Sequence, residues 1–452
     1  MNEVTIAERP ESPAGLLPPG PTRSGALQAV GFVLARRRVV GRLTRKYGAA
    51  FTVKLPVFGP TVVVTDPQLA KQLFAANTDD VGNIQPNLSR ILGPGSVFAL
   101  DRADHKRRRR LLTPPFHGKS IRNYEKIFEE ETLRESANWP LGQEFPMLEP
   151  MMRITLNAIL RAVFGADGAH LDELREIIPP WVTLGSRCAT LPTPKRDYGR
   201  WHPWGRLAEY RRRYDSVVGR LIEDVAADPH LADRDDVLAL LLRSTYEDGT
   251  AMSHTDIADE LLTLLAAGHE TTASTLAWVF ERISRHPEVL AKLVTEADGD
   301  RASEATGNVQ ANEYRQAVIL ETQRARTVID FAGRHVYAPA FELGKWVVPQ
   351  GYSIIVSLSQ LHALEFDDPV RFDPDRFVGN RPPLAWVPYG GGTRRCVGAV
   401  FANVEMDVVL RTVLRHFTIA TTSAPGEKVH SRGVAFTPKR GGRVVLARRA
   451  GA

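Results

Sequence analysis

The sequence predicts a mainly α-helical protein with a smaller β region. A helical pattern of apolar residues runs from Ser253 to Pro287, and similar patterns fill most of the chain between residues 120 and 228. Strand-like alternation is confined to short stretches outside these helical patterns. Of 452 residues, 43% are hydrophobic and 24% are charged, which suits a globular protein with a large core.

Charge and composition limit the class of protein. The formal net charge is +6, from 58 basic and 52 acidic residues, which argues against a nucleic-acid partner. Residues 1–25 are charged and rich in proline and lack the apolar run of a signal or membrane anchor, so we expect a flexible tail. Residues 26–452 are expected to form a single domain. Two cysteines fit a reducing compartment, so a cytoplasmic location is expected.

The individual elements follow from local patterns. A hairpin is expected around the Gly-Pro turn in 49–67, and short strands are expected in 344–358 and 434–449. Apolar residues recur at helical spacing in 120–139 and 146–165. Residues 171–228 are expected to form two helices joined by a connection that contains tryptophan and proline.

The longest helix is expected to begin at Ser253, with an acid, Asp256, three residues later as a capping signal. The pattern continues to Pro287, a length of roughly 50 Å. His269 and Glu270 lie in its middle, which disfavours a membrane span. A buried helix explains the pattern better.

The centre of this helix, "AAGHETT", allows two interpretations. In one, Gly268 permits close helix packing and Thr271 bonds back to a carbonyl one turn earlier. In the other, the helix widens locally into a groove where Glu270 and Thr271 handle protons. The motif alone leaves both open.

An acid and a base three residues apart, Glu321 and Arg324, share one face of the next helical pattern. Arg376 follows in the irregular stretch "FDDPVRFDPDRF" and could close a three-residue network on Glu321. We expect this network to be structural, and its disruption to be severe if it is buried.

Four consecutive arginines, Arg107 to Arg110, point in different directions if they lie on a helix. A solvated basic face is the common interpretation of such a run. His105 and Arg109, however, are four residues apart on one face and are suited to a ligand with two negative charges.

The stretch "PYGGGTRRCVG" surrounds Cys396, which has no nearby thiol or histidine-rich tract to pair with. A helical pattern follows, so the sulfur is expected at a positive helix end, and Arg394 and Arg395 add charge. We expect these groups to lower the thiol pKa. Three glycines, Gly390 to Gly392, admit a flat ligand. A planar, doubly anionic metal chelate suits all these features.

This loop resembles the haem-binding loop of the cytochrome P-450 monooxygenases of the soluble bacterial type. Gly392, Arg394, Cys396 and Gly398 fall in register with the family pattern, and Tyr389 replaces its usual phenylalanine. "AGHETT", "ETQR", "FDPDRF" and "HKRRR" resemble further motifs of the family, in the family's order. Thr327 and Val328 replace its usual pair of prolines.

The resemblance implies a role for each motif. Cys396 would be the axial thiolate of haem b (iron protoporphyrin IX), and Glu270 and Thr271 would deliver protons during oxygen activation. Glu321, Arg324 and Arg376 would be structural. The groups implied to bind the haem propionates are His105, Arg109, Arg334 and Arg394.

The implied activity is insertion of one oxygen atom from O2 into a hydrophobic small molecule. A separate ferredoxin or flavodoxin with its reductase would supply electrons, and the arginine run suggests a basic surface for such a partner. A peroxide-driven peroxygenase and a non-catalytic haem-based binding or sensing protein are the alternatives. The substrate pocket is expected to include Thr263, Ala266, Ala267, Asp330, Phe331 and Val434.

Overall fold

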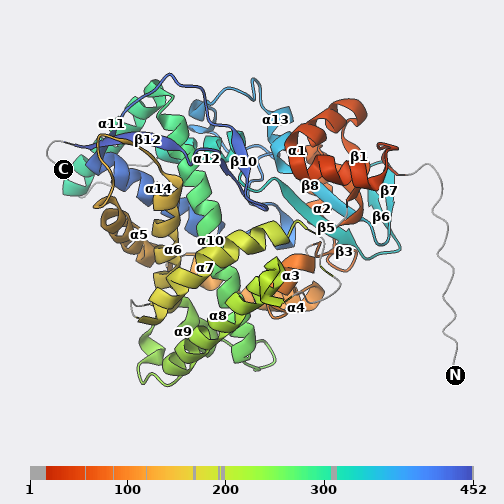
Figure 1. Ribbon diagram of the computed structural model, residues 1–452, viewed down its shortest axis with the longest axis horizontal. Coiled ribbons are helices and arrows are strands. Elements are labelled where there is room, and N and C mark those ends of the chain that lie inside the picture. Colours follow the sequence, from red (N-terminus) through yellow and green to blue (C-terminus); the bar gives the residue numbers. More distant parts are fainter. Residues whose placement is uncertain are drawn as a thin grey trace. The chain divides into compact units, whose positions relative to one another are not determined.

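The computed structural model of this chain describes residues 17–55, 58–84, 86–118, 120–165, 169–191, 194, 199–306 and 313–449. It confirms a mainly helical fold with minor β-sheets (Figure 1). The described residues group into two compact units, and the single domain expected for residues 26–452 stays a prediction. Unit 1 contains the residues up to Ile84 together with Gly333–Ser357, and unit 2 contains the remainder.

Unit 1 is built on a five-stranded sheet in the order β1-β2-β8-β5-β3. The predicted hairpin is formed by β1 and β2, and Gly59 begins β2 with φ of 66°. Strand β8 then pairs parallel to β2. The strands and helices of this unit are β1 (Ala50–Leu55), β2 (Gly59–Val64), β3 (Val81–Gly82), β5 (Phe331–Val336, whose first two residues belong to unit 2), β6 (Ala340–Leu343), β7 (Trp346–Pro349), β8 (Ser353–Ser357), α1 (Gly25–Tyr47) and α2 (Pro67–Ala75).

Part of the expected flexible tail is bound to this sheet. The carbonyl of Pro19 accepts from the backbone N–H of Thr52 at 3.0 Å, and the carbonyl of Pro18 accepts from its hydroxyl at 2.7 Å. Residues 1–16 of the predicted tail lie outside the described residues. The described proline-rich segment therefore extends along the first strand.

Unit 2 contains most of the helices. They are α3 (Pro86–Leu92), α4 (Arg102–Leu112), α5 (Ser120–Ser136), α6 (Leu148–Phe164), α7 (Ala169–Cys188), α8 (Pro203–Ala226), α9 (Val237–Arg243), α10 (His254–Ile283), α11 (Pro287–Thr306), α12 (Glu313–Ala325), α13 (Leu358–Glu365) and α14 (Ala399–His416). Its short strands are β4 (Glu144–Pro146), β9 (Phe417–Ile419), β10 (Val429–Ser431), β11 (Phe436–Pro438) and β12 (Arg443–Arg448).

Helix α10 is the predicted long buried helix. The Ser253 hydroxyl caps it by accepting from the backbone N–H of Asp256 at 3.1 Å, as the sequence indicated. The helix ends at Ile283, four residues before Pro287. It packs on α6, α12 and α14 (Figure 1). A Cβ added at Gly268 would lie 3.1 Å from Ile159 of α6, so this glycine serves close helix packing.

The start of α14 is held by an aromatic cluster. The ring of Phe401 meets the rings of Phe116, Tyr124 and Phe128 edge-on, with centroids 5.6, 5.2 and 5.0 Å away. Such edge-to-face pairs add to the free energy gained from burying apolar area. The cluster anchors the first turn of α14 on α5 and on the segment before it.

We expect Phe401→Ala to lower the free energy of unfolding by about 3–5 kcal/mol, because it leaves a cavity at the centre of this cluster. Urea unfolding followed by circular dichroism measures the change. Trp201→Ala is the control, since this side chain is 84% exposed and its loss should change stability by less than about 0.5 kcal/mol. Equal effects of the two substitutions would contradict the anchoring role.

Candidate functional site

The loop before α14 turns on two of its three glycines. Gly390 and Gly392 adopt φ values of 66° and 65°, where side chains with a Cβ are strained, whereas Gly391 is extended. The backbone N–H of Cys396 then donates to the carbonyl of Tyr389 at 3.0 Å and closes the loop. Cys396 thus lies three residues before the first residue of α14.

Cys396 retains solvent access, whereas the other cysteine, Cys188, is buried. Desolvation by the surrounding protein raises the pKa of the Cys396 thiol. The backbone N–H of Gly398 and the charges of Arg109 and Arg395 act in the opposite direction. The prediction of a lowered thiol pKa is therefore wrong for this chain on its own, because desolvation outweighs the positive groups. A bound metal cation would add the missing positive charge.

Tyr389, which stands where the family pattern has phenylalanine, binds two neighbouring helices through its hydroxyl. The hydroxyl donates to Oδ1 of Asn403 at 2.7 Å and accepts from Nε2 of Gln323 at 2.8 Å. Burial raises the pKa of Tyr389, so the phenol stays neutral. The extra oxygen thus joins the loop to α12 and α14 through hydrogen bonds.

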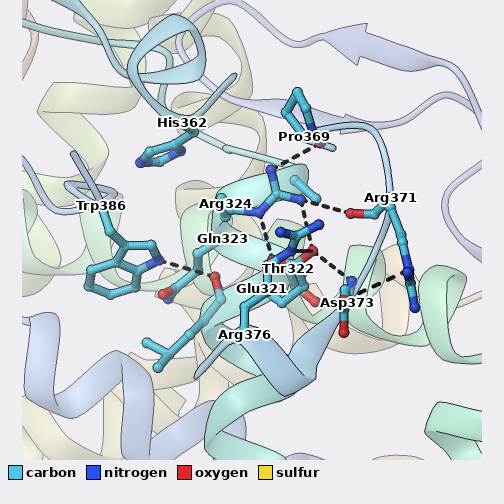
Figure 2. Close-up of polar contacts among 12 residues, drawn as sticks. Glu321, Thr322, Gln323, Arg324, His362, Pro369, Arg371, Asp373, Arg376 and Trp386 are labelled. Atoms are coloured by element: carbon cyan, nitrogen blue, oxygen red, sulfur yellow. Dashed lines mark hydrogen bonds and ion pairs between the residues drawn. The ribbon is translucent and has the colours of Figure 1, made fainter. Parts of the chain in front are cut away.

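Glu321 and Arg324 form a buried ion pair on α12 (Figure 2). Nε and Nη2 of Arg324 donate to the two carboxylate oxygens at 2.6 and 2.8 Å. The same guanidinium donates to the carbonyls of Pro369 and Arg371, each at 3.0 Å. The backbone N–H of Asp373 donates to the carboxylate at 2.8 Å. The pair therefore fixes the irregular segment that leads toward the Cys396 loop.

Arg376 joins this group at longer range. Its Nε lies 3.9 Å from Oε1 of Glu321, an ion-pair distance without a hydrogen bond. Its two terminal nitrogens donate to the carbonyls of Asp367 and Asp368 at 2.7 and 3.0 Å. The structure thus brings the three predicted residues together, with Arg376 mainly closing its own segment (Figure 2).

Further contacts hold the approach to the loop. Nε1 of Trp386 donates to the carbonyl of Leu320 at 3.2 Å, and the backbone N–H of Val387 donates to Nε2 of His362 at 3.2 Å. The other ring nitrogen of His362 lies 3.0 Å from the hydroxyl of Thr327. Thr327, one of the two residues that replace the usual proline pair, therefore helps to position the residues that precede Tyr389.

The four arginines of α4 separate, as expected of consecutive helical residues. Arg108 is buried and binds Glu260 at 2.9 Å, and the outer pair, Arg107 and Arg110, bind acidic side chains at positions 248 and 247. Three of the four charges are thus neutralised within the protein. The prediction that this run forms a basic surface is wrong, because carboxylates from the loop after α9 and from α10 pair with three of its arginines.

Arg109 alone turns toward the Cys396 loop, where it donates to the carbonyl of Arg395. His105, one turn earlier, is buried on the same face. Arg394 donates to the carbonyl of Leu100 at 2.8 Å and to the carboxylate of Asp101 at 2.6 Å. These bonds tie the loop to the N-terminus of α4 and gather positive groups around Cys396.

Arg334 lies in unit 1, on β5. Its guanidinium stacks 5.5 Å from the ring centroid of Phe74 and donates to the carbonyl of Gly333 at 2.8 Å. Its role toward a propionate stays a prediction from the family motif.

Thr271 and Glu270 face different surroundings on α10. The hydroxyl of Thr271 donates to the carbonyl of Ala267 at 2.9 Å, so the back-bonded interpretation holds for its geometry. The helix runs through this region without a break, so the expected widening does not interrupt it. Ala267 is nevertheless exposed and Thr271 half-buried, while most residues around them are buried. The centre of α10 therefore keeps one accessible strip made of small side chains.

Glu270 is buried and bonded to an arginine that the sequence did not single out. Nε of Arg432 donates to its carboxylate at 2.8 Å, and Nη2 of Arg432 donates to the hydroxyl of Thr183 at 3.0 Å. Burial raises the pKa of Glu270 despite the opposing charge of Arg432. A cavity of about 400 Å³ lies beside this pair, and its lining includes Asn157 and Arg175.

His269, next to Glu270, has no role as a charged group. Its Nδ1 lies 2.9 Å from the carbonyl of Leu265. Burial lowers the pKa of His269 to about 4, so the ring is neutral at pH 7. His269 therefore adds no positive charge to the centre of α10 at neutral pH.

The expected pocket residues differ in access. Ala266, Phe331 and Val434 are partly accessible, and Ala267 is exposed. Thr263 is buried, and its hydroxyl binds Ser96 at 2.7 Å and the carbonyl of Asp259 at 2.8 Å. Asp330 is 1% exposed. The small and apolar members of the set are thus the accessible ones, and contact between Asp330 and a substrate stays a prediction.

The residues present fit a haem on two observations. An accessible thiol stands just before α14, Arg109 is bonded to its loop, and His105 is buried one turn before Arg109 on the same helix. Helix α10 packs against α14 and keeps an accessible strip at Ala267 and Thr271. A haem held by a thiolate requires a sulfur ligand, small side chains beside its flat face and cations for its carboxylates.

Comparison with known proteins identifies the family. The family model for cytochrome P450 matches residues 18–443. The chain belongs to the cytochrome P450 family. Over 452 residues it is 64% identical to a protein of Mycobacterium tuberculosis provisionally named cytochrome P450 138, covering 99% of this chain and all of that protein. A second M. tuberculosis protein, provisionally named cytochrome P450 135B1, is 39% identical over 440 residues and covers 95% of this chain and 91% of its own length.

Solved cytochrome P450 structures share the fold. The retinoic acid-bound cyanobacterial CYP120A1 matches with a TM-score of 0.82 and 21% identity, covering 96% of this chain and 100% of that chain. The cytochrome P450DA heme domain matches with a TM-score of 0.77 and 20% identity, covering 96% and 98%. Membership of the cytochrome P450 family implies a haem-thiolate oxidoreductase.

Sequence reasoning missed several residues that shape this P450 site. Arg432 lies in a C-terminal hairpin, 162 residues from Glu270, and no local pattern connects the two. Asn403 and Gln323 bind Tyr389 from two different helices. Gln323 stands inside the "ETQR" motif, so the motif marked the helix without indicating this contact.

We expect Arg324→Lys to lower the free energy of unfolding by about 3–5 kcal/mol, because lysine cannot bind both carboxylate oxygens and both carbonyls, which leaves a buried charge poorly paired. Urea unfolding measures the change. Arg153→Lys is the matched control: Arg153 makes the same forked contact with Glu135, but its side chain is 54% exposed. Arg153→Lys should lower the free energy of unfolding by no more than about 1 kcal/mol. Similar losses for both variants would contradict a special role of the buried pair.

Proposed function

We propose that the protein is a haem-thiolate monooxygenase that inserts one oxygen atom of O2 into a hydrophobic small molecule. Electrons come from a separate ferredoxin or flavodoxin with its reductase. The observation that carries the proposal is the accessible thiol of Cys396 just before α14. Helix α14 packs against α10, whose centre is accessible. Family membership supports the reaction class.

Cys396 would bind the haem iron through its sulfur, and the bound haem supplies the oxygen-activating redox chemistry. The loop's task is to present the sulfur without a competing partner. The N–H of Gly398 and the guanidiniums of Arg109 and Arg395 stabilise negative charge on it. His105, Arg109 and Arg394 are the unit 2 groups that would bind carboxylates of the cofactor.

Glu270 and Thr271 would move protons on α10. The raised pKa of Glu270 lets its carboxyl both take up and release a proton nearer to neutral pH. Arg432 holds the carboxylate beside the cavity of about 400 Å³, from which water could exchange protons with it. The Thr271 hydroxyl, on the accessible strip, would pass the proton on. Arg432 is thus a positioning residue for Glu270.

The substrate is proposed to be an uncharged or weakly polar molecule of moderate size. Ala266, Ala267, Phe331 and Val434 are partly or fully accessible and bring small or apolar surface. The hydroxyl of Thr263 is already hydrogen-bonded within the protein, so it offers a substrate no free donor. Binding would therefore depend on removing apolar area from water.

Cys396→Ser should abolish the absorption band of a thiolate-ligated haem in the reduced, carbon monoxide-treated protein, because a serine oxygen does not replace the sulfur ligand. Cys188→Ser is the matched control, since this thiol is buried, and it should leave the spectrum unchanged. An unchanged thiolate spectrum in the Cys396 variant would falsify the assignment of the ligand.

Thr271→Ala should uncouple the enzyme, so that reductant is consumed while hydrogen peroxide appears in place of product, because the proton donor on the accessible strip is lost. Product, peroxide and reductant are measured together. Thr275→Ala is the control, because it removes an equivalent bond to a carbonyl one turn earlier, at 3.0 Å, from a buried side chain.

Coupling that stays at the wild-type level in Thr271→Ala would refute the proton role. Turnover with hydrogen peroxide alone, at the rate seen with reductase and ferredoxin, would favour a peroxygenase. Substrate binding and efficient reduction without any product would favour a sensing protein.

A further inference from the structure

Helix α1 of unit 1 exposes a cluster of large aliphatic side chains. Leu27, Val30, Val33 and Leu34 are 63, 55, 53 and 80% exposed. Twelve large hydrophobic side chains are exposed in the described part of the chain, and four of them fall within the eight residues from Leu27 to Leu34. Leu27, Val30 and Leu34 are spaced three and four residues apart, so they share one helix face. An apolar cluster of this kind marks an interaction surface.

The opposite face of α1 is already occupied. Ala29, Val40 and Thr44 are buried, and the helix packs on β1 (Figure 1). The hydroxyl of Thr44 is bonded to the carbonyl of Val40 at 2.9 Å. The first half of α1 therefore keeps Val30, Val33 and Leu34 exposed to solvent, and Leu27, also largely exposed, borders a cavity that Val53 and Leu55 of β1 line.

The second half of α1 is strongly basic. The helix contains five arginines and one lysine, at positions 36, 37, 38, 42, 45 and 46, and no aspartate or glutamate. Arg38, Arg42 and Arg45 are exposed at spacings of four and three, and none of them makes an ion pair with a carboxylate in the ranges that the structure describes. A backbone kink at Ala35, with φ of −144° and ψ of 39°, separates the apolar half from the basic half.

We propose that α1 binds the surface of an anionic membrane. Its aliphatic half enters the boundary between headgroups and acyl chains, and its arginines contact the phosphates of anionic lipids. None of the helices within the described ranges is long and apolar enough to cross a bilayer, so the contact is interfacial. The inference is independent of the haem chemistry proposed above.

The charge pattern favours lipid over another protein copy. Two α1 helices packed through their aliphatic halves would bring sets of unpaired arginines into the same contact, where like charges repel. A mixed bilayer surface offers apolar depth beside negative charge, and it requires no matching shape. An anionic bilayer surface therefore suits both the aliphatic first half and the basic second half of α1.

The test is co-sedimentation of the full chain with sucrose-loaded vesicles. Vesicles of phosphatidylcholine mixed with phosphatidylglycerol should bind the protein, binding should weaken as salt is raised, and pure phosphatidylcholine should bind it far less. Arg38→Gln, Arg42→Gln and Arg45→Gln combined should lower the partition coefficient by about a hundredfold. Leu27→Ser with Leu34→Ser should lower it by about tenfold or more.

Leu364→Ser with Val370→Ser is the matched control, because these side chains are 60% and 88% exposed in unit 2. It should leave vesicle binding unchanged. Circular dichroism checks that every variant is folded. Failure to sediment with either vesicle overturns the proposal, as does binding that both α1 variants retain. Concentration-dependent self-association that the leucine variant abolishes, without vesicle binding, would assign the face to a second copy instead.

Discussion

Glu321 and Arg324 place opposite charges where water has no access, and a buried ion pair is stable only when its other polar atoms are also satisfied. Main-chain groups at positions 369, 371 and 373 provide these partners. If that segment moved away, the buried ion pair would lose these hydrogen-bond partners. The same helix binds Trp386 through a carbonyl and Tyr389 through Gln323. One short helix thus holds the chain from residue 369 to the loop that presents Cys396.

Helix α10 serves two different tasks on neighbouring residues. Gly268 allows close packing because Ile159 of α6 lies only 3.1 Å from the place where a Cβ would stand. Glu270 turns to Arg432 and the cavity beside it, whereas Thr271 lies on the accessible strip with Ala267. The packing interpretation of the "AAGHETT" motif therefore holds for Gly268 and for the back-bonded hydroxyl of Thr271. The proton role of Glu270 and Thr271 stays a proposal.

Two runs of arginine show how context decides the meaning of a sequence feature. Residues 107–110 lie in unit 2 beside acidic side chains, and only Arg109 is directed at the Cys396 loop. Arg38, Arg42 and Arg45 lie on a helix without acids, and they make no ion pair within the described ranges. A charge run becomes an interaction surface only when the fold leaves it uncompensated. The proposed redox partner therefore cannot be recognised through the first of these runs as a whole.

The sequence by itself determined the helical fold class, the start of α10 and the spaced motifs of the family, because these depend on local periodicity, capping and fixed residue spacing. It also indicated the pair at Glu321 and Arg324, which are three residues apart on one helix. Only the tertiary structure decided that Arg432 binds Glu270, that the hydroxyl of Tyr389 binds Gln323 and Asn403, and that the pKa of the Cys396 thiol is raised. These features depend on the packing of segments far apart in the chain, where the cost of removing a group from water outweighs the charges visible beside it in the sequence.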